Sequence, residues 1–98
     1  MVTLRELEEL VQRSRRYDLK IRIKFKGTKY SVLIDKEIRA LDEMGNPTSW
    51  SKAFPLAPHQ ALTNYPLDSV QVECGGEVIW SGESMSELLK AIDDLRCS

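Results

Sequence analysis

The side chains able to bind a metal or attack a substrate are few, because His59, Cys74 and Cys97 are the only histidine and cysteines in the chain. A zinc site would have to combine them with a carboxylate, at spacings that match no zinc finger or ribbon. A nucleophilic pair of Cys74 and His59 has suitable residue types, but nothing in the sequence places the two together. Glycine-rich phosphate loops and serine-hydrolase motifs are missing. The sequence therefore predicts no enzyme, no metal and no cofactor.

The number of cysteines also indicates the cellular compartment of the protein. Two are too few for the disulfide framework of a small secreted domain, and the first fifteen residues are amphipathic with acidic residues near their start, unlike an export signal. No apolar run approaches the roughly 18 residues of a membrane span. We therefore expect a cytoplasmic protein with reduced thiols and no membrane association. A bridge between Cys74 and Cys97 is the alternative, because Cys97 lies on a terminal tail that could reach many places.

A basic segment is the feature of the sequence that most strongly suggests a binding function. Between Arg13 and Lys29 there are eight positive residues and one negative residue. Four of the cations are predicted on one strand face: Lys20, Arg22, Lys24 and Lys26. Their spacing of about 7 Å, two residues of strand rise, is close to the phosphate repeat of a single nucleic-acid strand. Such residues also keep an exposed sheet face soluble.

The second candidate surface lies in the middle of the chain. The section from Glu43 to Pro58 has weak regular structure, which in a compact domain is often functional. Trp50 and Phe54 can serve as an exposed apolar anchor for a partner, since aromatic residues dominate interface energetics. They can equally close the open edge of a small core. Both interpretations stay open at this point.

Two helices must frame these candidate residues. Thr3 and Glu6 form a capping box, and the leucines that follow recur at helical spacing. Ser84 and Glu87 form a second box, followed by an apolar stripe that runs from Met85 to Leu95. We therefore predict one helix at each end of the chain.

Strands are predicted between the helices. Residues 19–25 alternate strictly, and a turn at Gly27 and Thr28 leads into a second alternating run at 29–36. A two-residue loop would place Ile21 opposite Ile34, Ile23 opposite Val32 and Phe25 opposite Tyr30. A third strand is predicted over 37–42 and a returning strand over 49–54.

The remaining elements are a short helix and a last hairpin. Pro58 suits the first turn of a helix that stops before Pro66. Residues 70–74 and 78–80 alternate around Gly75 and Gly76. A three-residue loop over 75–77 with a glycine bulge keeps each face consistent, because it places Val72 opposite Trp80.

These elements predict an α+β two-layer sandwich in a single domain over residues 1–98. Its antiparallel sheet should have about four to six strands, with the N- and C-terminal helices on one face and the other face in water. Residues 1–36 carry a net charge of +5 and residues 37–98 carry −6, although the whole chain carries −1. This asymmetry makes self-association possible.

The absence of catalytic motifs favours a non-catalytic interaction module: an adaptor, inhibitor or accessory subunit that binds a protein partner. Its predicted contacts are Lys20, Arg22, Lys24, Lys26, Trp50 and Phe54. The alternative is nucleic-acid binding through the basic face of the first hairpin. A pI of about 5.8 counts against that alternative, since nucleic-acid domains are usually basic overall.

Overall fold

In the computed structural model, which describes residues 2–97, the chain begins with helix α1 (Leu4–Tyr17). Both halves of its capping box are present: the Glu6 N–H donates to Thr3 Oγ1 at 3.1 Å, and the Thr3 N–H donates to Glu6 Oε1 at 3.0 Å. The helix ends at Asp18, whose left-handed backbone (φ 54°) turns the chain toward the sheet. The local sequence therefore fixes both ends of this helix.

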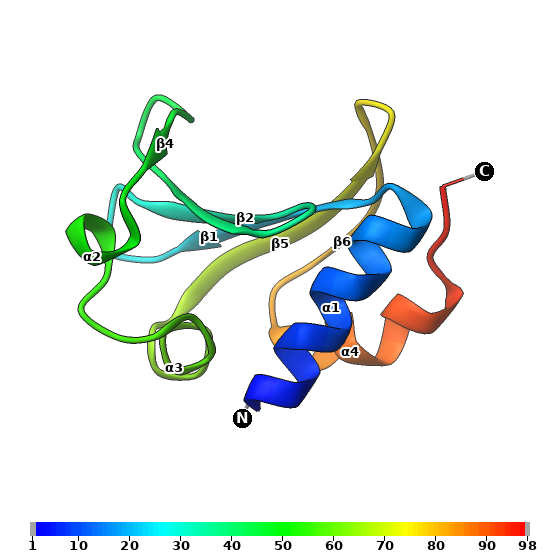
Figure 1. Cartoon of the computed structure of the whole chain (residues 1–98), viewed down its shortest axis with the longest axis horizontal. Helices are drawn as coiled ribbons and strands as arrows, with labels where there is room; N and C mark the ends of the chain where they lie inside the picture. The colour runs from blue at the N-terminus through cyan, green and yellow to red at the C-terminus, as the bar shows by residue number, and fades with distance from the viewer. Residues whose placement is uncertain (1, 98) are drawn as a thin grey trace.

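Six strands form one antiparallel sheet in the order β4-β3-β2-β1-β5-β6. Their bounds are β1 (Lys20–Phe25), β2 (Ser31–Ile34), β3 (Ile38–Leu41), β4 (Pro47–Thr48), β5 (Leu67–Cys74) and β6 (Glu77–Gly82). Helix α1 lies under one face of the sheet together with α3 (Pro58–Asn64) and α4 (Met85–Ala91), and a 3-10 turn (Ile92–Asp94) follows α4 (Figure 1). The predicted α+β sandwich with both terminal helices on one face is confirmed.

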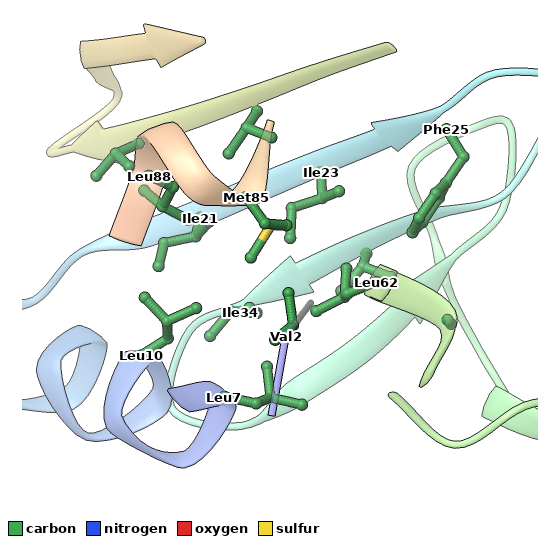
Figure 2. Close-up of a cluster of buried hydrophobic side chains, with 14 of the residues drawn as sticks. Val2, Leu7, Leu10, Ile21, Ile23, Phe25, Ile34, Leu62, Met85 and Leu88 are labelled. Atoms are coloured by element: carbon green, nitrogen blue, oxygen red, sulfur yellow. The ribbon is translucent and has the colours of Figure 1, made fainter. Parts of the chain in front are cut away.

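The core fills the space between the helices and this face of the sheet. Side chains from α1, α3 and α4 converge on those of β1 and β2 (Figure 2). Ile21, Ile23 and Ile34 are fully buried, and Leu7, Leu10 and Leu88 cover them from the helices. Burial of this apolar surface is the main favourable term that holds the two layers together.

The first hairpin sorts its side chains as the alternation predicts. Ile21 lies opposite Ile34, and Ile23 lies opposite Val32, which are two of the three expected pairs. Strand β1 ends at Phe25 and β2 begins at Ser31, so the connection is longer than a two-residue loop. Lys20 and Lys24 are exposed on the other face, whereas Ile21 and Ile23 have no exposed surface.

The middle of the chain differs from expectation. Residues 49–54 do not form a returning strand: the strand that pairs with β3 is β4, and helix α2 (Trp50–Ala53) follows it. Because helical neighbours four residues apart share a side, Trp50 and Phe54 lie together, with their ring centroids 4.7 Å apart. The same turn leaves Lys52 exposed, whereas strand alternation would place it on the same face as the two aromatic residues.

The last hairpin has a tighter turn than predicted. Cys74 lies opposite Glu77, so the loop is the two residues Gly75 and Gly76, both with positive φ (58° and 88°). Two consecutive positive φ angles are typical of a type I′ turn. Val72 still lies opposite Trp80, because the irregularity falls within the strands beyond the turn. The predicted pairing of Val72 with Trp80 is correct. The predicted loop length is wrong, because Val78 lies opposite Glu73 and not opposite Cys74, as a three-residue loop requires.

A disulfide joins Cys74, at the end of β5, to Cys97 on the C-terminal tail, with their Cα atoms 5.4 Å apart. The prediction of reduced thiols is therefore wrong for this structure, and the alternative, a bridge between the two cysteines, is what it contains. Cys74 lies two residues after the buried Val72 and on the same side of the strand, so its sulfur points to the layer where the tail packs. No helix within residues 2–97 has the length and apolar character needed to cross a membrane.

Candidate interaction surface

The face of the sheet away from the helices is concave. In Figure 1 the β3–β4 turn and the tip of the β5–β6 hairpin both rise away from the helices, at opposite ends of the sheet. Strand β1 runs between these two raised ends. The alternation of β1 places Lys20, Arg22 and Lys24 on this concave face, which we call the open face.

The neighbouring strands surround the three cations with polar groups and one apolar side chain. Arg22 lies between Leu33 on β2 and Gln71 on β5, and Lys24 lies between two serines. The Arg22 guanidinium pairs with the Glu73 carboxylate, whose side chain is only 15% exposed. Arg22 is thus largely neutralised within the sheet.

The lysines remain available for other contacts. Lys20, Lys24 and Lys26 are exposed, and none of them takes part in an ion pair within residues 2–97. Lys26 lies just past the end of β1, where its backbone N–H donates to the carbonyl of Pro66 at 3.0 Å. Of the predicted basic row, Lys20 and Lys24 thus lie on the open face without an ion pair among residues 2–97, Arg22 is paired there, and Lys26 lies beyond the end of the strand.

A polar hollow of about 470 Å³ lies on the open face at the end of β1 near the β3–β4 turn. Its lining contains both signs of charge: Arg22, Lys24, Lys29, Asp42, Glu43 and Asp68. Leu41, which is buried, and Met44 also contribute to the lining. The open face is thus a mixed-charge surface with apolar elements and not a uniformly basic one.

Residues 42–46 form an ordered turn at the rim of this hollow. Asp42 Oδ1 accepts the backbone N–H groups of Met44 and Asn46, both at 2.9 Å. The Asp42 N–H donates to the Asn46 carbonyl at 2.9 Å, and the Gly45 N–H donates to the Asp42 carbonyl at 3.0 Å. This carboxylate-capped turn holds Met44 outward with 79% of its surface exposed.

Met44 is the candidate contact that the sequence reasoning missed. In the section from Glu43 to Pro58 the sequence points to Trp50 and Phe54 alone, although a large apolar side chain between Glu43 and Gly45 is visible there. A methionine is well suited to a contact surface because its unbranched thioether adapts to different partners. Its place at the rim puts it beside the cations of the open face.

The predicted anchor pair, Trp50 and Phe54, lies elsewhere. Phe54 is only 3% exposed and packs edge-on against Phe25, with their centroids 5.2 Å apart, so it belongs to the core. The half-buried Trp50 donates its indole N–H to the Leu56 carbonyl at 2.7 Å. An exposed role is wrong for Phe54, because a small core uses its large ring to close the end of the sheet. Phe25 points to the helix side, so this pair and the open face are not one surface.

The residues considered for metal or nucleophilic chemistry are not brought together. His59 lies on α3 and Cys74 near the tip of the β5–β6 hairpin, at opposite ends of the molecule (Figure 1). The sulfur of Cys74 is bonded to Cys97, so it is not a free thiol. Among residues 2–97, no three acidic, histidine or cysteine side chains are grouped as a metal site would need.

The fold and this surface define a small α+β sandwich with one uncovered sheet face. The chain matches no protein-family model, and no curated protein or solved structure is detectably similar to it. The physical character of the surfaces is therefore the basis for any statement about function.

Proposed function

We propose that the protein is a non-catalytic interaction module that binds a protein partner on its open face. Lys20 and Lys24 supply electrostatic contacts, and Met44 supplies an apolar one. The partner we expect presents carboxylates next to an apolar side chain, since that arrangement complements free lysines beside an exposed methionine. The supporting observation is that these exposed groups share one concave sheet face with no helix over it.

The mixed charge of the face supports a protein ligand over a polyanion. Asp42, Glu43 and Asp68 line the same hollow as Lys24, so a nucleic-acid backbone would meet repulsion there. A protein can match both signs with its own side chains. Leu33, which is partly exposed beside Arg22, adds apolar surface that nucleic-acid phosphates would not use.

The test compares the proteins that the wild type retains with those that matched variants retain. Lys24→Glu and Met44→Asp should each lose the same partner, because one reverses a contact charge and the other removes the apolar contact. Lys90→Glu, an exposed charge reversal on α4, is the control and should retain it. Loss of the partner with all three variants, or with neither Lys24→Glu nor Met44→Asp, contradicts the proposal.

Nucleic-acid binding through the basic segment is the second candidate, supported by Lys20, Lys24 and Lys26, which have no ion-pair partner within residues 2–97. If these three neutralise phosphates, log K should fall with log salt at a slope of about −2.7 on duplex DNA or about −2.1 on a single strand. Fluorescence anisotropy at several salt concentrations measures this slope. Binding that is undetectable at low salt eliminates this candidate.

Cytoplasmic location stays a prediction. Its argument from reduced thiols is weakened by the Cys74–Cys97 bridge, because disulfides persist mainly in oxidising compartments. Trapping thiols with an alkylating reagent in living cells tests it: alkylation of both cysteines supports a reducing compartment, and protection of both opposes it.

A further inference from the structure

Three guanidinium groups surround one aromatic ring at the C-terminal end of α1. The guanidinium carbons of Arg13, Arg16 and Arg96 lie 5.7, 5.4 and 5.4 Å from the centroid of the Tyr17 ring. The C-terminal tail, which carries Arg96, runs beside this end of the helix (Figure 1). Attraction to the ring face favours each cation singly, but the three like charges repel one another.

The cluster holds less negative charge than positive charge. Asp93 pairs with Arg13, with 2.7 Å between Asp93 Oδ1 and Arg13 Nη2. Arg16 and Arg96 form no ion pair in the part of the chain that the structure describes. The neighbouring Arg15 is engaged elsewhere, because its Nε donates to the Lys36 carbonyl.

Arg13 also has an unused donor. Its Nη1 atom is buried and has no hydrogen-bond partner within residues 2–97. A buried N–H group without an acceptor is costly, so native structures rarely leave one unpaired. A hollow of about 280 Å³ lies beside Arg13, and its lining contains both signs of charge: Arg13, Arg16, Glu9 and Asp93, together with Gln12 and Tyr17. Each of the two carboxylates already has a cation, because Glu9 pairs with Arg5 and Asp93 with Arg13. Arg96 approaches the Tyr17 ring at the edge of this hollow and is not part of its lining.

We propose that this cluster, the Tyr17 site, binds the phosphate group of a small-molecule phosphate monoester. Near neutral pH such a group carries a charge of about −1.5 to −2, which suits the two cations, Arg16 and Arg96, that have no ion pair among the described residues. Guanidinium forks match the geometry of phosphate oxygens and can donate two hydrogen bonds each. The hollow has the volume of several water molecules at about 30 Å³ each, so it has room for more than the phosphate alone.

The disulfide positions the third arginine. Cys97 follows Arg96 directly, and its bond to Cys74 fixes the tail against the end of β5. A tail without this bond would have to order itself on binding, at a cost in conformational entropy. The Tyr17 site is thus preorganised by a covalent link, and it uses none of the open-face residues.

The test is a nuclear magnetic resonance titration of the ¹⁵N-labelled full chain with inorganic phosphate and with phosphoserine, at constant ionic strength set by chloride. We expect saturable shifts of amides in residues 13–17 and 93–97, with a Kd of about 1 mM for inorganic phosphate and no weaker binding of phosphoserine. Shifts that spread over the surface without saturating overturn the proposal. Saturation by phosphate but not by phosphoserine overturns the monoester assignment.

Two charge-removing variants distinguish binding at this site from a general effect of the protein's charge. Arg16→Gln should weaken phosphate binding about tenfold or more, the loss expected when one charge-assisted hydrogen bond is removed. Lys52→Gln removes one positive charge from α2, on the opposite side of the molecule from the end of α1 (Figure 1), and should change the Kd less than twofold. Arg16 and Lys52 are both exposed, so both variants should fold. Equal effects of the two variants overturn the proposal.

A second pair of variants tests Arg13, whose replacement could disturb folding. Asp93→Asn removes the carboxylate that competes for this guanidinium, so phosphate should bind severalfold more tightly. Asp94→Asn removes the same charge one residue away, from a side chain with no ion pair among the described residues, and should have a smaller effect. Unchanged binding in Asp93→Asn contradicts a role for Arg13.

Discussion

Gly82 lies directly against the ring of Trp80. A Cβ atom built on Gly82 would lie 2.6 Å from Cη2 of Trp80 and 2.7 Å from Oε2 of Glu87. The same Glu87 carboxylate accepts the backbone N–H of Glu83 at 3.1 Å, just before α4 begins. A side chain at the point where β6 passes into the last helix would therefore displace the Trp80 ring and the Glu87 carboxylate.

We expect Gly82→Ala to lower the free energy of unfolding by about 1–2 kcal/mol, because the added methyl group forces the indole and the carboxylate to move. Urea denaturation measures the change. Ser81→Ala, the exposed neighbour on the other face of β6, is the control and should be nearly neutral. The same substitution in a Trp80→Leu background should cost less, and an undiminished loss there would show that the indole is not the obstacle.

The Cys74–Cys97 bond should contribute substantially to stability. It closes a loop with a sequence separation of 23 residues, for which the chain-entropy relation gives about 3 kcal/mol. We therefore expect reduction with a phosphine to lower the free energy of unfolding by about that amount. The Cys74→Ser/Cys97→Ser double variant should resemble the reduced protein and should not respond to reductant. Equal free energies of unfolding for the oxidised and reduced chains would show that the bond does not stabilise the folded state.

Phe54 and Trp50 should behave differently when truncated. Phe54→Ala removes a buried ring that contacts Phe25, Tyr30 and Tyr65, and we expect a loss of about 3–5 kcal/mol. Trp50→Phe keeps a ring beside Phe54 and removes only the hydrogen bond to Leu56, for a loss of about 1 kcal/mol. Thermal denaturation of both variants distinguishes them, and a loss for Phe54→Ala below that for Trp50→Phe would place Phe54 outside the core.

The elements that the sequence predicts correctly are those governed by local physics. Strict alternation over residues 19–25 determines which side chains meet the helices, because a shift of one residue would reverse every one of them. The cap at Thr3 is equally local, since its two hydrogen bonds span three residues. At the second predicted box, the Glu87 N–H donates to Ser84 Oγ at 3.2 Å, but the Glu87 carboxylate turns to Glu83 instead of Ser84.

The features that the sequence does not predict depend on contacts between distant parts of the chain. Trp50 and Phe54 fit either a strand or a helical turn, and the choice follows from packing against Phe25. The disulfide depends on where a terminal tail docks, which no local pattern specifies. The approach of Arg96 to Tyr17 follows from the same docking, so the Tyr17 site is invisible in the sequence, where Arg16 and Arg96 are eighty residues apart.

Ser14 is the one buried polar side chain of the described core, and we expect its hydroxyl to contribute little to stability. It is 1% exposed, and its Oγ donates to the Leu10 carbonyl at 2.9 Å. That carbonyl is also the helical acceptor for the Ser14 backbone N–H, so Ser14→Ala leaves no unpaired group behind. The lost hydrogen bond should be offset by the higher helix propensity of alanine, for a net change within about 0.5 kcal/mol. Leu10→Ala on the same helix is the contrast, with an expected loss of about 2–5 kcal/mol from the cavity it leaves. Urea denaturation of both variants measures these changes, and a loss above about 1.5 kcal/mol for Ser14→Ala would mean that the hydroxyl makes a stabilising contact beyond the Leu10 carbonyl.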